Sequence, residues 1–209
     1  DAVVLVIGVS SGIRSDLVRV WSHITTLGLP CLLFLNELDK EESSLDNVCA
    51  MCQRDLGLTP LPMSLPYSCG GHLEGVLDLA QDVLITSRAE TPLHQQLPIP
   101  EDARVLAADG RKRIQESVAE CDDRLLEQYL AMGELTQEDL IEGLRVATRT
   151  RTVIPLYRGS AMNNIGIIPL LNAIVDLLPS PMDRPSTTSF EGLHPDTGEP
   201  VHRRTICED

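Results

Sequence analysis

The glycine-bearing segment from Gly8 to Arg14, Gly-Val-Ser-Ser-Gly-Ile-Arg, is the first stretch whose residue types could bind a phosphate. It follows a short apolar run and precedes a helical pattern, which is where phosphate-binding loops occur. Such a loop reads G-x-x-x-x-G-K-[ST], with backbone amides around the phosphates and a lysine on the outer ones. Here the spacing between the glycines is one residue short, and Arg14-Ser15 stands in place of Lys-Ser.

The same segment could be the dinucleotide-binding turn of a short-chain dehydrogenase, but Arg14 occupies the position of the third glycine. That family also carries a Tyr-x-x-x-Lys pair at its catalytic centre. No lysine stands four places after a tyrosine here, since those positions are Gly71, Gly133 and Ala161. We therefore favour a β-α turn that needs flexible glycines over either ligand-binding interpretation.

A second candidate is a zinc site formed by Cys49-x-x-Cys52 and Cys69-x-x-His72. The first pair lies in a helical pattern whose apolar face is made of Leu45, Val48, Cys49, Cys52 and Leu56. Cysteine pairs that bind zinc usually lie on a turn, so we favour core packing and expect no metal. We expect all six cysteines to be reduced, because the sequence carries no secretion signal.

Composition and charge exclude several classes of function. The net charge of -14 argues against DNA binding through phosphate contacts and against adsorption to an anionic membrane. No apolar run approaches the roughly 20 residues of a membrane-spanning helix. Because the chain opens on Asp1, without a signal peptide or an initiator methionine, we expect a cytoplasmic fragment or processed piece.

Three buried runs and two helical patterns predict a parallel α/β sheet. The runs cover residues 2–7, 31–35 and 152–157, and each is short and continuously apolar, as in strands buried on both faces. Between the first two, Ser15 is the expected N-cap of a helix that ends at Gly28. Another helix is expected from about Ser44 to Leu56, which completes a β-α-β-α order.

The middle of the chain breaks this order. Residues 59–86 predict a small antiparallel sheet, and residues 87–100, with three prolines, predict a loop. Helical periodicity covers about 101–120, 122–131 and 137–148, and Thr136 with Asp139 predicts a capped start for the last helix. After a helix at about 168–178, residues 182–209 indicate a polar linker with a turn at 195–198.

Two motifs at strand ends carry the most information about function. Asn36-Glu37-Leu38-Asp39 closes the second buried run, and Gly159-Ser160-Ala161 closes the third. In translational GTPases, Asn-Lys-x-Asp closes one strand and Gly-Ser-Ala closes the next. Over nearly its whole length the chain resembles the elongation factor G family, and ribosomal-protection and release-factor GTPases share parts of the pattern. The segments that carry the resemblance are Ala2–Ile7, Gly12–Ile13, Val20–Trp21, Leu29–Pro30, Phe34–Asp39, Leu65–Pro66, Gly75–Leu79, Leu125–Leu130, Glu134–Thr136, Pro155–Ala161, Asn163–Ile167, Pro169–Leu171, Leu177–Pro181, Gly192 and Pro195–Glu199.

The resemblance implies an incomplete α/β sheet of the P-loop GTPase type, made of its last three strands, with an α+β inserted subdomain. Residues 1–57 and 136–181 would be the C-terminal part of the GTPase domain, and 58–135 the insert. Residues 182–209 would be a linker and the start of a barrel-like domain. Asn36, Asp39, Ser160 and Ala161 would bind guanine. The carboxylate accepts hydrogen bonds from guanine N1 and N2, which adenine cannot supply. The asparagine contacts N7, and a backbone amide beside Ser-Ala reads O6.

Two departures from the family pattern bear on activity. The matching region begins after the phosphate loop, the switch regions and the Asp-x-x-Gly motif, so we assign no catalytic residue. GTP or GDP and Mg²⁺ serve the parent family, but we expect neither to bind tightly here. Glu37 replaces the motif's lysine and adds a negative charge near an anionic ligand, at a cost of about 1 kcal/mol. The parent would hydrolyse GTP to drive ribosomal translocation; the alternative is a degenerate protein-interaction module without hydrolysis.

The resemblance also implies partners. In relatives, helices of the insert contact the acidic stalk protein of the ribosome. The dense basic cluster Arg111-Lys112-Arg113 is the candidate contact here, and a solvated helix face is the equal alternative. The run at 2–7 would lie next to an absent strand, so it could also pair with a second copy of the chain.

Overall fold

The computed structural model describes residues 1–40, 45–86, 95–180, 183 and 189–204. The chain divides into two compact units, one of Ala2–Leu178 and one that comprises Pro179–Asp209 with Asp1. Each unit is described by itself.

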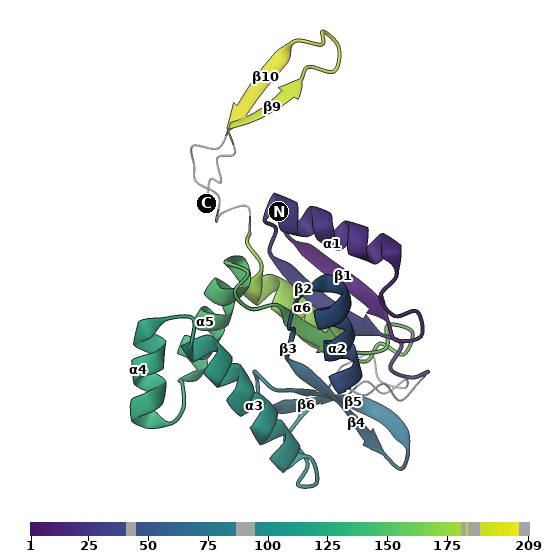
Figure 1. The fold of residues 1–209 in the computed structure, drawn as a ribbon, viewed down its shortest axis with the longest axis vertical. Helices are drawn as coiled ribbons and strands as arrows, with labels where there is room; N and C mark the ends of the chain where they lie inside the picture. The colour runs from purple at the N-terminus through teal and green to yellow at the C-terminus, as the bar shows by residue number, and fades with distance from the viewer. Residues whose placement is uncertain (41–44, 87–94, 181–182, 184–188, 205–209) are drawn as a thin grey trace. The chain divides into compact units, whose positions relative to one another are not determined.

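A four-stranded parallel sheet forms the centre of the larger unit (Figure 1). Its strands are, in spatial order, β1 (Val3–Gly8), β2 (Cys31–Asn36), β8 (Pro155–Arg158) and β3 (Leu61–Pro62). Val3 pairs with Cys31, and Leu33 pairs with Leu156, which sets the register of the first three strands. The three predicted strands are confirmed. The fourth, β3, lies within the range 58–135 assigned to the insert, and two residues with one proline are too short to leave a pattern.

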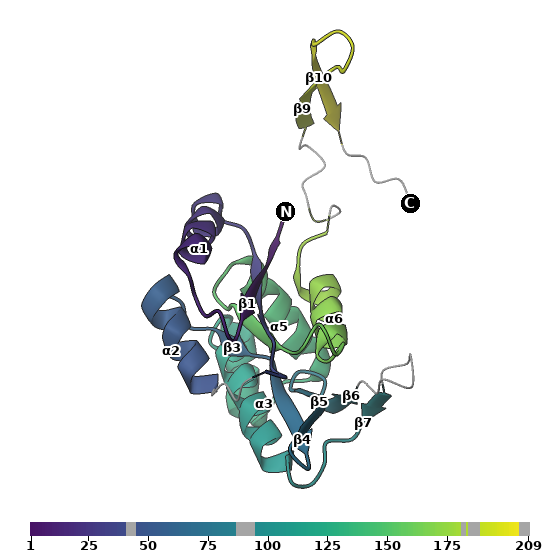
Figure 2. The same cartoon turned by 90° about the vertical axis from the view of Figure 1, so that its right-hand side faces the viewer.

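Helices cover both faces of this sheet. Figure 2 shows α1 (Ser15–Leu27) and α2 (Leu45–Leu56) on one side of the strands and α6 (Ile167–Leu177) on the other. Successive side chains of a strand point to opposite faces of the sheet. Leu33 and Leu35 therefore pack with α1 and α2, whereas Leu32 and Phe34 pack with α6. With both faces covered, β2 is buried from Cys31 to Leu35.

The ends of α1 test two sequence predictions. Gly28 ends the helix in the left-handed conformation, with φ of 66°, as predicted. The prediction that Ser15 is the N-cap is wrong, because Ser15 is the first helical residue and Arg14 is the N-cap, without a side-chain cap. Asp16 in the first turn contributes a favourable interaction with the helix dipole instead.

A four-stranded antiparallel sheet follows α2. It contains, in order, β4 (Ser64–Cys69), β5 (His72–Asp78), β6 (Val83–Thr86) and β7 (Gln95–Leu97). The sheet predicted for residues 59–86 is confirmed, but β7 extends it into the predicted loop at 87–100, of which 87–94 lie outside the described residues. Gln96 pairs with Ile85 through the backbone, and such a pairing leaves no hydrophobic pattern in a polar segment. Gly75 permits close packing, since a Cβ there would lie 2.4 Å from the Ile85 carbonyl oxygen.

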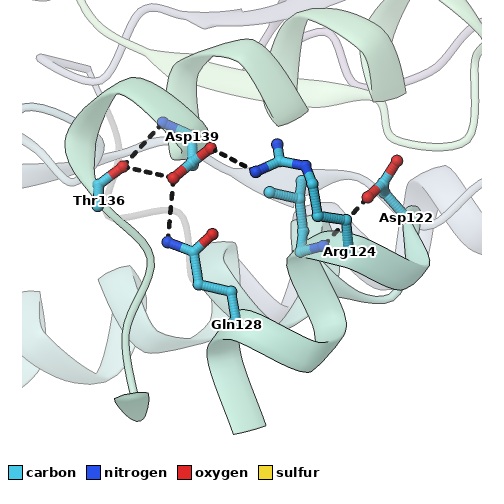
Figure 3. A network of polar contacts seen from close by, with 6 residues as sticks. Asp122, Arg124, Gln128, Thr136 and Asp139 are labelled. Atoms are coloured by element: carbon cyan, nitrogen blue, oxygen red, sulfur yellow. Dashed lines mark hydrogen bonds and ion pairs between the residues drawn. The ribbon is translucent and has the colours of Figure 1, made fainter. Parts of the chain in front are cut away.

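Three helices complete this region: α3 (Arg104–Ala119), α4 (Asp123–Met132) and α5 (Gln137–Arg149). The predicted cap of α5 is confirmed, because Thr136 Oγ1 accepts the Asp139 N–H at 3.2 Å. The Asp139 carboxylate also accepts hydrogen bonds from Thr136, Arg124 and Gln128, which ties α4 to α5 (Figure 3). These bonds hold the pKa of Asp139 down at about 2.

The smaller unit contains an antiparallel hairpin of β9 (Ser189–Leu193) and β10 (Pro200–Arg204). The predicted turn at 195–198 joins them, with the His194 N–H donated to the Glu199 carbonyl at 2.8 Å. Among the helices that the structure describes, none has the length and apolar character needed to cross a membrane.

Candidate functional site

Asn36 and Ala161 join the two strand-end motifs directly. Asn36 Oδ1 accepts the backbone N–H of Ala161 at 2.9 Å, between residues 125 positions apart in the sequence. The two loops are further linked by the Gly159 N–H, which is donated to the Leu35 carbonyl at 2.9 Å, and by the Leu38 N–H, which is donated to the Gly159 carbonyl at 3.2 Å. Because β2 and β8 are parallel neighbours, their carboxyl ends bring both motifs to one edge of the sheet.

The loop after β8 is tightly closed. Ser160 and Ile165 exchange backbone hydrogen bonds, and the Ser160 hydroxyl accepts the Asn163 N–H at 3.4 Å. A Cβ on Gly159 would lie 2.2 Å from the Ile165 carbonyl oxygen, so only glycine fits there. Ser160 is buried by these contacts, whereas Ala161 lies exposed at the surface.

Asp39 lies in the turn that follows β2. The Lys40 N–H is donated to the Glu37 carbonyl at 3.1 Å, which closes the turn, and the Asp39 side chain is exposed. Four of the predicted site residues, Asn36, Asp39, Ser160 and Ala161, therefore lie on two loops that are hydrogen-bonded to each other. A carboxylate accepts hydrogen bonds and a backbone amide donates one, so these two groups together suit a ligand edge that carries both donors and an acceptor.

The Glu37 carboxylate contacts one residue of its own turn and one residue of the loop after β1. Its carboxylate accepts a hydrogen bond from the Ser10 hydroxyl, and Lys40 Nζ lies 2.6 Å from its other oxygen. These two contacts, the Lys40 one first, hold the pKa of the Glu37 carboxyl below its ordinary value. The same ion pair raises the pKa of Lys40. Sequence reasoning identified the charge at position 37 but not its partner Ser10, which comes from the loop after β1.

The turn from Gly8 to Gly12 uses its own amides internally. The N–H groups of Ser11 and Gly12 are both donated to the Gly8 carbonyl, at 3.2 and 2.9 Å. A phosphate cradle needs such amides to point outward at the ligand. The geometry therefore agrees with a β-α turn at this place.

The basic cluster on α3 divides into one internal and two exposed cations. Arg111 donates to the carbonyls of Leu79 and Ala80 at 3.0 and 2.6 Å and to Gln137 Oε1 at 2.9 Å, so it fastens α3 to its neighbours. Lys112 and Arg113 are exposed, and Lys112 Nζ lies 3.8 Å from Glu116 Oε1.

The two pairs of residues that could have formed a zinc site lie on different elements of the structure. Cys49 and Cys52 belong to α2, where Cys52 is fully buried in the core and burial raises its pKa to about 11. Cys69 and His72 flank the exposed β4–β5 turn. Within the part of the chain that the structure describes, no group of three or more His, Cys, Asp or Glu side chains could hold a metal ion.

Comparisons with known proteins extend this description. Residues 1–180 match the family described as the elongation factor Tu GTP binding domain. The fold is also similar to the crystal structure of a protein from Thermus thermophilus, with a TM-score of 0.79 and 28 % sequence identity. That match covers 90 % of this chain, and this chain spans only 28 % of the other protein's length.

Proposed function

The chain belongs to the elongation factor Tu GTP-binding domain family, and from that premise we propose that its two joined loops recognise guanine in a translational GTPase similar to elongation factor G. The observation that carries the proposal is the hydrogen bond between Asn36 Oδ1 and the Ala161 amide. It holds together two motifs that would each contact the same base. The working protein would be a cytoplasmic factor that acts on the ribosome.

Each residue has a distinct part in base recognition. The exposed Asp39 carboxylate accepts the N1 and N2 hydrogens of guanine, a pair of donors that adenine lacks. The Ala161 amide donates to O6, and Asn36 positions that amide and contacts N7. Since the Ala161 N–H is bonded to Asn36 at 2.9 Å, guanine O6 must share or replace this bond.

The proposal assigns base recognition alone to this chain. In the family, bound GTP with Mg²⁺ supplies a phosphoanhydride whose hydrolysis drives conformational change. The chemistry of the described residues suits the base, because two hydrogen-bonded loops carry an exposed carboxylate and a surface amide. We assign none of them to the phosphates, since the Ser11 and Gly12 amides are directed at Gly8.

Nucleoside binding tests this proposal without phosphate chemistry. We expect guanosine, and not adenosine, to shift the amide NMR signals of Asp39 and Ala161 in the ¹⁵N-labelled chain. Asp39→Asn replaces an acceptor with a donor and should change the preference from guanosine to xanthosine, which carries an oxygen at C2. Asp109→Asn, an exposed carboxylate on α3, is the matched control. Equal shifts with adenosine would exclude guanine recognition here.

Glu37 favours a second candidate function, a protein-interaction module without hydrolysis. Its carboxylate bonds to Ser10 and Lys40, which fastens the turn without nucleotide. If guanosine leaves the loops unchanged in both the native chain and Glu37→Lys, the interaction module is the better assignment. Guanosine binding that appears only in Glu37→Lys would mean that recognition has been lost through this one substitution.

Contact with the acidic ribosomal stalk protein is the partner that we propose for α3. Lys112 and Arg113 are exposed and can meet acidic groups, whereas Arg111 is engaged within the subdomain. Lys112→Glu with Arg113→Glu should weaken stalk binding and its dependence on salt. The control is Arg19→Glu, which reverses an exposed cation on α1. Unchanged affinity of the double variant would favour a merely solvated helix face.

A further inference from the structure

A cavity of about 210 Å³ lies at the amino ends of β2 and β8, at the opposite end of the sheet from Asn36 and Ala161. Its apolar wall is made of Trp21, Ile24 and Ile154, with Cys31, the first residue of β2, beside them. Thr148 and Arg151, from the end of α5 and the turn after it, also line the cavity, together with Thr25, Leu29 and Thr150. All of these residues belong to the larger unit and are separate from the proposed guanine site.

Thr148 lines this cavity with a hydroxyl that has no hydrogen-bond partner among the described residues. The residue is 0 % exposed, and its Oγ1 is both buried and unsatisfied. A buried hydroxyl without a partner is unfavourable, and most such groups in proteins are satisfied by protein, water or ligand. The hydroxyl lies just beneath the cavity wall, so a polar atom of a ligand would satisfy it after a small shift of this wall.

Arg151 supplies a positive charge at the mouth of the cavity. Its guanidinium lies over the end of α1, where Nη1 donates to the Thr25 carbonyl at 3.4 Å, and the side chain is exposed. The residue has a φ of 63°, an uncommon conformation for a non-glycine residue. Its backbone N–H is donated to the Thr148 carbonyl at 3.1 Å, so the hydroxyl and the guanidinium belong to one turn of chain.

The rest of the lining carries no charge, and besides its apolar side chains it includes Thr25 and Thr150. The Trp21 indole is fixed by a hydrogen bond from Nε1 to the Leu56 carbonyl at 2.9 Å. Burial raises the pKa of the Cys31 thiol to about 11, so the thiol stays protonated at neutral pH. Arg151 is thus the charged side chain in the lining, and an anionic group of a ligand would meet it at the mouth.

We propose that this cavity binds a small carboxylate that has a compact apolar body, such as one aromatic ring. The ring would lie against Trp21, Ile24 and Ile154, and the carboxylate would accept hydrogen bonds from Thr148 and Arg151. The size is suitable, because an apolar cavity of about 150 Å³ holds benzene and the present one is about 210 Å³. A guanidinium is also the side chain best matched to a carboxylate.

Benzoate, compared with its neutral relative benzamide, is the probe for this site. In NMR titrations of the ¹⁵N-labelled chain, benzoate should shift the amide signals of Ile24, Cys31 and Thr148 with a dissociation constant on the order of 1 mM. Benzamide should bind at least about fivefold more weakly, because it lacks the charge that Arg151 meets. No shift of these signals up to about 20 mM benzoate, or equal binding of the two probes, would overturn the proposal.

Two variants and one control separate the roles of the lining residues. Thr148→Val removes the hydroxyl at nearly constant volume and should weaken benzoate binding about tenfold, without lowering the melting temperature. Arg151→Gln should have a similar effect on benzoate and none on benzamide. Thr26→Val is the matched control, since Thr26 is exposed outside the lining and its hydroxyl bonds to the Ser22 carbonyl at 2.8 Å. Native-like benzoate affinity in both Thr148→Val and Arg151→Gln would contradict the assignment, and Arg151→Gln alone decides it if Thr148→Val does not fold.

Discussion

Glu37 has a backbone φ of 73°, a left-handed conformation that costs a side-chain-bearing residue about 1 kcal/mol or more. The conformation directs its carboxylate to Ser10 and Lys40, which compensate for the strain. The sequence identified position 37 as a departure from the lysine of related motifs. It could not show the contact with Ser10, because that contact depends on how the loop after β1 lies against the turn after β2.

We expect the Glu37 carboxyl to titrate below 4.5, its ordinary value, since Lys40 and Ser10 stabilise the ionised form. A depressed pKa contributes stability above the ordinary value, and this contribution is lost as the pH falls through the lowered one. Carbon-detected NMR of the Glu37 side chain gives the titration curve. Lys40→Gln should move the midpoint upward, and a native midpoint at or above 4.5 would contradict the ion pair.

At the scale of elements, the strands and helices that bury a regular apolar pattern were predictable, and the pairing of the shortest strands was not. The runs at 2–7 and 31–35 became β1 and β2, but only β2 is buried on both faces as expected, because Val6 of the edge strand β1 is exposed. By contrast, β3 is two residues long and β7 three, and each is defined by a neighbouring strand. Ser15 failed as a cap because Arg14 already has the extended conformation that precedes the helix.

The junction of α4 and α5 should lose stability when its central carboxylate is removed. We expect Asp139→Asn to unfold at a lower temperature than the native chain at pH 7, since the carboxylate accepts bonds from Thr136, Gln128 and Arg124. Its pKa is about 2, so the stabilisation is complete above the ordinary value of 3.8 and is lost as the pH falls toward 2.

Thermal unfolding followed by circular dichroism between pH 3 and 7 measures this effect, with Asp123→Asn in the first turn of α4 as the control. The difference in melting temperature between Asp139→Asn and the native chain should become smaller toward pH 3. A difference that stays constant with pH would mean that the carboxylate's charge is not what stabilises the junction.

The edge strand β1 should mediate self-association of the 209-residue chain. It pairs with β2 on one side, and on its other edge no described strand covers it. Its Val6 side chain is 52 % exposed. Val6→Lys should suppress dimers in sedimentation velocity at moderate salt, because a charge on an edge strand opposes pairing. Leu130→Lys, at an exposed position of α4, should not. A native chain that sediments as a clean monomer would refute this expectation.

For the whole molecule, membership of the translational GTPases and the fold class were predictable from the sequence, whereas the hydrogen bonds between the two strand-end motifs were not. The family resemblance predicted one guanine site from Asn36 and Ala161, and the strands that end at these motifs are parallel neighbours in the sheet. That the Asn36 side chain holds the Ala161 amide required the structure. The cavity beside Thr148 left no sequence signal, since its lining comes from α1, β2 and the end of α5.

The chain should bind GDP only weakly, with a dissociation constant above about 10 µM. Its 209 residues contain no G-x-x-x-x-G-K-[ST] segment, and the amides of Ser11 and Gly12 are committed to Gly8. Phosphate contacts normally supply most of the affinity for a nucleotide. Isothermal titration with GDP and Mg²⁺ is the measurement, and a dissociation constant below about 10 µM would show that other residues supply these contacts.

The bond between Asn36 and Ala161 also sets an order of events in folding. β1 and β2 are joined through one helix and can pair early, whereas the two halves of the guanine-type site are 125 positions apart. Closing that long loop costs entropy before any contact is gained, so β8 should dock after the intervening subdomain has collapsed. The bond between Asn36 and Ala161 would then form among the last steps, and a nascent or kinetically trapped chain would hold a formed β1–β2 pair with the two loops still apart.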